Sequence, residues 1–177
     1  QGKPVLLGAE HVFNTALCTE MGTPEYSVKT IEHLFAALHA YRITDVTIEV
    51  DGGEVPILDG SALPWVEAIE EAGIKPCADN TPPILQPVTQ EIQLEHGVAT
   101  VTGTDELTLE IDFSYPVTGL KNMHAKYTIT PEVFKREIAP ARTFCRLEDV
   151  EHMREAGLIQ GGSLECACVF KPDGSVE

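Results

Sequence analysis

The sequence has 177 residues, of which 43% are hydrophobic and 23% charged, and its formal net charge is −16 at pH 7. This length and composition are typical of one globular domain or two small ones and exclude a disordered chain. The acidic balance repels phosphate backbones, and no apolar run approaches the roughly 20 residues that cross a bilayer, so we expect no nucleic-acid partner and no integral membrane segment.

The cysteines are odd in number and scattered without a disulfide framework, which indicates reduced thiols and a cytoplasmic protein. They are Cys18, Cys77, Cys145, Cys166 and Cys168. The last two can be read as a metal-binding pair. Their spacing, however, places the two sulfur atoms on opposite faces of a strand, and this is the interpretation that we favour.

Residues 27–41 have the periodicity of a helix, with Ser27 as its N-cap and one apolar stripe. The stripe consists of Val28, Ile31, Phe35 and Leu38. The opposite face begins with Glu32 and His33 and continues with alanines only. Because alanine side chains let a backbone or a ligand approach closely, we expect this helix to be buried on both sides.

A hairpin is predicted for residues 46–57, with its turn at 51–53, because apolar residues alternate with polar ones on either side of the turn. A second helix follows, with Pro64 in its first turn and Gly73 as its C-terminal stop. Its predicted inner side consists of Trp65, Val66 and Ile69.

Four prolines among polar residues make residues 75–87 the best candidate for a domain boundary. We therefore predict a first α+β domain over residues 1–78 and a partial second α+β domain over residues 79–177.

In the second half, residues 98–103 and 106–115 are predicted to pair as strands, with alternating apolar residues covering one face. Further elements are predicted as a strand at 126–130, a helical turn at 131–137, a helix at 147–156 and a strand at 164–170. Gly157 and Leu158 fit a C-terminal cap of that helix. Helices packed on mostly antiparallel sheets define an α+β fold.

Glu32 and His33 are adjacent, so their side chains diverge by about 100° on a helix. This geometry permits one metal ligand and one general base beside the same cavity, because a metal ion lowers the pKa of its bound water to about 7. The alternative is a structural histidine that is hydrogen-bonded at a domain interface. Thr143 likewise has two interpretations: a hydroxyl that stabilises an oxyanion, or a helix-cap or turn residue.

Together these segments resemble the UDP-3-O-acyl-N-acetylglucosamine deacetylases, a zinc-dependent family of lipid A biosynthesis. Residues 27–34 are similar to the T-[VI]-E-H helix of that family, and residues 54–61 to its E-[IV]-P-[IL]-[LM]-D-G-S signature. Residues 141–145 resemble its A-R-T-F element, and residues 156–163 its G-L-x-x-G-G-S element. The similarity runs over nearly the whole sequence in the same order.

The resemblance implies two similar α+β layers that face each other across a catalytic groove, with a zinc ion (Zn²⁺) as cofactor. His33 matches a zinc ligand, Glu32 the general base, and Thr143 the hydroxyl that holds the oxyanion. The β-α-β insert at 143–170 matches the passage for the acyl chain. The implied substrate-binding residues are Leu17, Cys18, Phe144, Arg146, Leu147, Val150, Ile159, Gly162, Ser163, Ala167 and Val169.

Two departures from the family pattern stand out. Arg146 occupies a position where many members carry an aromatic residue, and an arginine there can stack or bind a diphosphate oxygen. The family also completes its zinc site with a later H-x-x-x-D pair and uses a further C-terminal histidine. No histidine of this sequence has an aspartate four residues later, so we expect only part of the zinc site here.

Three hypotheses follow from these observations. The first is part of a cytoplasmic deacetylase that acts on a UDP-linked acylated glucosamine and is a monomer when complete. The second is a shortened, non-catalytic module that binds the acylated sugar nucleotide. The third is a purely structural α+β domain.

Overall fold

The computed structural model describes residues 6, 8–23, 25–77, 89–115, 120–155, 157, 159 and 162–177. Four small sheets and several helices make it an α+β protein, as predicted. The first half contains η1 (Ala9–His11), β1 (Val12–Asn14), β2 (Glu20–Gly22), β3 (Ser27–Val28), α1 (Glu32–Ala40) and α2 (Leu63–Ala72). The second half contains β4 (Gln90–Leu94), β5 (Gly97–Val101), β6 (Thr108–Phe113), β7 (Met123–Thr128), α3 (Pro131–Val133), the π-helix η2 (Phe134–Ile138), β8 (Phe144–Arg146), α4 (Leu147–Glu155) and β9 (Cys168–Phe170).

Helix α1 begins at Glu32, so the predicted helix over 27–41 is wrong in its first turn. Ser27 lies in β3, which pairs antiparallel with β2, and its hydroxyl donates to Glu20 instead of capping a helix. Thr30 separates strand from helix, because its φ of 60° is incompatible with a right-handed helix. The apolar periodicity predicted α1 correctly from Glu32 onward, but its first member, Val28, belongs to strand β3.

The hairpin predicted for residues 46–57 is also wrong. Residues 43–50, all of which the structure describes, form no strand, and the side chains of Val46 and Ile48 are exposed. The backbone around Glu54 bonds to Lys29 instead: the amide of Lys29 donates to Gly53 at 2.9 Å and that of Val55 to Lys29 at 3.0 Å. The predicted return strand of the hairpin therefore pairs, at Glu54, with Lys29, which lies just before α1.

Helix α2 agrees with the prediction at both ends. Pro64 lies in its first turn, and Gly73 ends it with a φ of 78° and an amide that donates to Ile69. Val66 is fully buried on the inner side, with Trp65 and Ile69 partly buried beside it.

The strands of the second half pair differently from the prediction. Strand β5 pairs with β4 across the turn at Glu95 and His96, and β6 pairs with β7. Residues 98–103 and 106–115 therefore do not pair with each other. The predicted covered face is also wrong within the described residues, because Leu109 and Ile111 are 43% and 55% exposed.

Helix α4 is confirmed over Leu147–Glu155, and Gly157 has a φ of 74° with its amide bonded to Arg154. Ala156 and Leu158 lie outside the described residues. The last predicted strand is shorter than expected, because residues 164–166 form a turn before β9. Cys166 is buried in that turn, so the prediction that it shares a strand with Cys168 is wrong.

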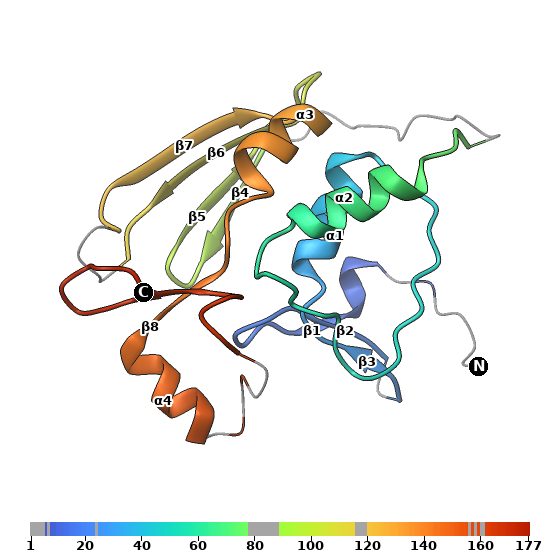
Figure 1. Cartoon of the computed structure of the whole chain (residues 1–177). Coiled ribbons are helices and arrows are strands. Elements are labelled where there is room, and N and C mark those ends of the chain that lie inside the picture. Colours follow the sequence, from blue (N-terminus) through green and yellow to red (C-terminus); the bar gives the residue numbers. More distant parts are fainter. Residues whose placement is uncertain are drawn as a thin grey trace.

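One hydrophobic cluster joins the two halves of the chain. Ala37, Ala40 and Val66 from α1 and α2 pack with Phe134 and Ala139 from the second half. Figure 1 shows α3 and the following turn against the α1–α2 pair, with the two hairpins on the far side. The alanine face of α1 thus packs against another part of the chain, and its small side chains allow this close approach.

Gly60 is required where the first half meets the turn before β9. Its φ is 81°, and a Cβ there would lie 1.8 Å from the carbonyl oxygen of Cys166. Gly73 has nearly the same φ, 78°, but a Cβ there would meet nothing within 4 Å.

We therefore expect Gly60→Ala to lower the free energy of unfolding by about 1–3 kcal/mol more than Gly73→Ala, because only the first substitution adds a clash to the cost of the left-handed backbone. Urea denaturation of both variants measures the difference. Equal destabilisation would contradict the close packing at Gly60.

Candidate active site

Glu32 is the first residue of α1 and is held by a backbone contact. Its Oε2 accepts a hydrogen bond from the amide of Thr19 at 3.1 Å, and the side chain is partly buried. This contact places the carboxylate beside the predicted substrate residues Leu17 and Cys18. Leu17 is 71% exposed with a φ of 67°, and Cys18 is half-buried.

His33 has a buried ring nitrogen without a partner. Its Nδ1 is shielded from solvent and makes no hydrogen bond to any residue in the described part of the chain. A buried polar atom without a partner costs free energy, so such an atom in a folded protein calls for an explanation. A metal ligand that lacks its ion has this character, and His33 therefore fits the role of a zinc ligand. The hydrogen bond that a structural histidine would make is not seen within the described ranges.

The metal site is not complete in the described residues. They contain no group of three or more histidine, cysteine, aspartate or glutamate side chains that could hold a metal ion. Catalytic zinc usually has three protein ligands. Of the residues predicted from the sequence, His33 thus fits a zinc ion as one ligand of a larger set.

Thr143 is positioned by its backbone. Its amide donates to the carbonyl of Gly60 at 2.7 Å, and its own carbonyl accepts from the amide of Cys168 at 2.9 Å. The side chain is exposed. These bonds fix Thr143 between the glycine turn of the first half and strand β9, and they leave the hydroxyl on the surface, where a ligand can reach it.

Phe144 belongs to an aromatic cluster that joins the second hairpin to the insert. Its ring packs edge-to-face with those of Tyr115 and Phe170, at centroid distances of 5.5 and 5.7 Å, and with Phe113 at 6.3 Å. It remains 39% exposed. One side of the ring is therefore held by packing, and part of the ring is open to a ligand.

Arg146 already has acidic partners. Its Nε and one terminal nitrogen donate to the two carboxylate oxygens of Asp149, at 2.7 and 2.5 Å, and Glu148 lies 3.8 Å away. The hydrogen bonds from Arg146 lower the pKa of the Asp149 carboxyl, and those to Asp149 raise the pKa of the guanidinium. A diphosphate oxygen would have to compete with this bidentate pair.

The remaining predicted acyl-passage residues lie on or around the β8–α4–β9 unit. Strand β8 pairs parallel with β9, and α4 follows β8 directly. The unit therefore has the β-α-β order expected of the insert. Its members range from exposed to buried: Leu147 (39% exposed), Ile159 (36%), Gly162 and Ser163 (both exposed), Val150 and Ala167 (half-buried), and Val169 (7%).

The predicted residues thus form two groups. Glu32, His33, Leu17 and Cys18 surround the start of α1, and the rest surround β8, α4 and β9. Gly60 links the halves by accepting the amide of Thr143, but no hydrogen bond joins Glu32 or His33 to Thr143 among the residues that are described.

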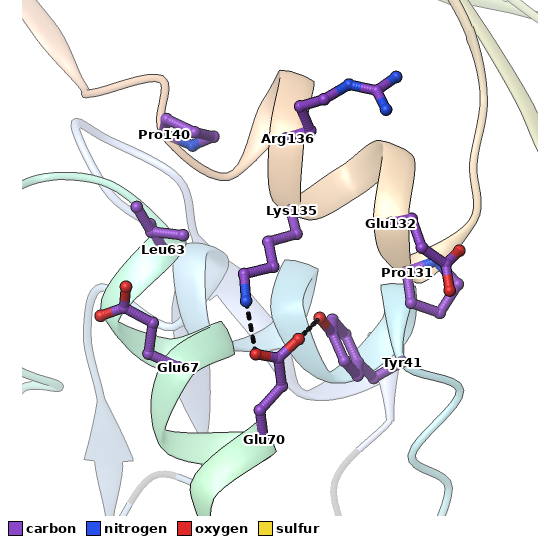
Figure 2. A pocket seen from close by; sticks show the side chains of 9 residues that line it. All are labelled: Tyr41, Leu63, Glu67, Glu70, Pro131, Glu132, Lys135, Arg136 and Pro140. Carbon is purple, nitrogen blue, oxygen red and sulfur yellow. Dashed lines mark hydrogen bonds and ion pairs between the residues drawn. The ribbon is translucent and has the colours of Figure 1, made fainter.

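A pocket of about 580 Å³ lies elsewhere, where the end of α1 meets α2, α3 and η2. Figure 2 shows Glu70 at its base between Lys135 and Tyr41, with hydrogen bonds of 2.6 Å to each. Burial, followed by the bond to Glu70, raises the pKa of Tyr41 to about 12, and the bond from Lys135 lowers the pKa of Glu70. The sequence did not point to this cluster, because its members come from three distant segments.

Two other contacts were missed by sequence analysis. Thr30 donates to Glu54 at 2.6 Å just before α1, and Thr19 holds Glu32 through its backbone. The contact of Thr19 could not be predicted, because every residue except proline has a backbone amide. Glu54, in contrast, is the first residue of the signature at residues 54–61, which could have drawn attention to it.

Fold and site together define an α+β protein that presents, at the start of one partly buried helix, an acid and an imidazole whose Nδ1 has no hydrogen-bond partner among the described residues. Residues 2–177 match the family described as LpxC, UDP-3-O-acyl N-acetylglycosamine deacetylase. The chain belongs to this family.

Relatives named UDP-3-O-acyl-N-acetylglucosamine deacetylase support the assignment. The chain is 42% identical to the one from Thermosynechococcus vestitus over 99% of the chain and 61% of the relative. It is 36% identical to the one from Helicobacter hepaticus over 99% of the chain and 58% of the relative. The chain thus spans about three fifths of the length of these curated relatives. No helix in the described ranges is long and apolar enough to cross a membrane.

Proposed function

We propose that the protein that carries this chain removes the N-acetyl group from UDP-3-O-acyl-N-acetylglucosamine, a step of lipid A biosynthesis, with zinc as its cofactor. The observation that supports this most is found at the start of α1. A carboxylate held by a backbone amide lies next in sequence to a histidine whose buried Nδ1 has no partner in the part of the chain that the structure describes. The family membership and the names of the relatives supply the substrate class.

Glu32 acts as the general base in this proposal. The amide of Thr19 occupies one position on Oε2 and orients the carboxylate. The other oxygen, Oε1, is then available to take a proton from the attacking water, and a positioned carboxylate contributes to catalysis in this way. His33, the next residue, contributes one imidazole nitrogen to the metal site. A zinc ion, when bound there, polarises the amide carbonyl and acidifies water.

The second group of residues binds the substrate. The exposed Thr143 hydroxyl donates to the developing oxyanion, and its fixed backbone limits the reorganisation that this contact requires. Phe144 lies beside the sugar, and the small and apolar side chains of the β8–α4–β9 unit contact the acyl chain. We further propose that the complete protein works as a cytoplasmic monomer.

The assignment of His33 can be tested by zinc affinity, with His39 as a matched control. His39 lies on the same helix and is exposed. In the whole protein encoded by the reading frame that contains this sequence, we expect His33→Ala to weaken zinc binding by more than about 100-fold, the upper cost of losing an outer-shell partner. His39→Ala should leave the affinity unchanged.

The measurement is competition with a chelator of known zinc affinity, followed by an assay of acetate release with and without added zinc. Native zinc affinity in His33→Ala would contradict the ligand role. Full activity after stripping the metal would contradict zinc dependence.

A further inference from the structure

Thr30 has a strained backbone in a buried place. Its φ is 60°, and the residue is only 7% exposed. A β-branched residue is a true outlier in the left-handed region, because its side chain crowds the backbone there. Such strain persists only where surrounding contacts hold it, and it gathers at functional sites.

The contacts that hold Thr30 come from residues 53–55. The Thr30 hydroxyl donates to Oε1 of Glu54 at 2.6 Å. On the strand side of Thr30, the backbone of Lys29 bonds to Gly53 and Val55, at 2.9 and 3.0 Å, and these bonds form a parallel bridge between Lys29 and Glu54. One side-chain hydrogen bond and two backbone hydrogen bonds therefore hold the turn at Thr30 against residues 53–55.

This turn determines how α1 begins. The N-cap of α1 is Ile31, whose apolar side chain makes no capping hydrogen bond. Glu32 and His33 are its first two residues, so the direction of Thr30 sets where both side chains point. The left-handed conformation of Thr30 lies between β3 and α1 and redirects the chain from the strand into the helix.

We propose that Thr30 and Glu54 are positioning residues, which hold the left-handed turn that aims Glu32 and His33. The proposal rests on the proposed function for its catalytic readout. Neither residue contacts the reacting atoms, and both act through the start of α1. Thr30 takes the strained conformation, and the Glu54 carboxylate holds its hydroxyl in place.

The test compares two Thr–Glu pairs in the whole protein. Thr30→Val removes the hydroxyl and keeps the shape, and Thr30→Ser keeps the hydroxyl. Thr23→Val is the matched control, because the Thr23 hydroxyl donates to Glu25 at 3.3 Å on the exposed surface. The readouts are kcat, KM and the NMR resonance of the Thr19 amide, which reports its bond to Glu32.

We expect Thr30→Val to lower kcat about 10- to 100-fold with KM changed less than about 3-fold, because a small displacement of a catalytic group is costly. The Thr19 resonance should shift in the same variant. Thr30→Ser should restore both readouts, and Thr23→Val should change neither. A Thr30→Val protein with native kcat and a native Thr19 resonance overturns the proposal, even if its stability is lower.

Glu54→Ala is the second variant, because Glu54 is exposed and its loss leaves the core intact. It should reproduce the effects of Thr30→Val, with Glu25→Ala as its control, and native readouts would again overturn the proposal. If the unmodified protein releases no acetate, the proposed function fails. The Thr19 resonance then still decides the positioning role, by shifting in Thr30→Val and returning in Thr30→Ser.

Discussion

Replacing Glu32 by Gln is expected to lower kcat for deacetylation by about 10²- to 10⁴-fold, the usual contribution of a general base. The amide of glutamine cannot take a proton from water. Its oxygen can still accept the hydrogen bond from Thr19, which is 3.1 Å long in the native protein, so the geometry at the start of α1 is kept. The loss therefore measures basicity rather than position.

Acetate release by the zinc-loaded whole protein gives kcat and KM for this variant. Glu25→Gln is the control, because Glu25 is an exposed acid of the same half of the chain. A Glu32→Gln enzyme that retains native kcat would show that another group takes the proton. It would also leave the third hypothesis, a purely structural domain, as the better description of this helix.

Phe134→Ala is expected to lower the free energy of unfolding by about 3–5 kcal/mol, which is typical of a large aromatic side chain removed from a core. Phe134 is 5% exposed and packs with Ala37, Ala40 and Val66. Ala37 and Ala40 are too short to fill the space that the ring would vacate. The resulting cavity would lie between the second half of the chain and the helix that carries His33.

Chemical denaturation measures this loss, with Phe13→Ala as the control. Phe13 is 58% exposed, so Phe13→Ala should lower the free energy of unfolding by about 0.5 kcal/mol or less. A small effect of Phe134→Ala would mean that the two halves are held together by other contacts, such as the bond between Gly60 and Thr143. The same variant should also weaken zinc binding if the docked second half supports α1.

The alanine face of α1 has a structural explanation in this cluster. Ala37 and Ala40 are 0% and 5% exposed, and η2 with its following turn rests against them. Ala36 is exposed on the same helix. The close approach that the sequence predicted is therefore made, at Ala37 and Ala40, by residues of the second half of the chain.

Local signals in the sequence determined helices α2 and α4. Pro64 and Gly73 marked α2 at both ends, and the acidic first turn of α4 together with Gly157 marked the last helix. These signals work because a helix closes its hydrogen bonds within four residues. The spacing of short motifs was likewise a property of the sequence alone, and it was sufficient to predict the family that the comparisons later confirmed.

Only the tertiary structure decided the strand partners and the geometry of the site. Alternation of apolar residues predicts which side chains of a strand share a face. It does not predict the partner strand, because the backbone makes the hydrogen bonds between strands. Strands β5 and β6 therefore took β4 and β7 as partners, and the segment at Glu54 paired with the approach to α1. The left-handed turn at Thr30 was invisible for the same reason, because the carboxylate that holds it comes from 24 residues away.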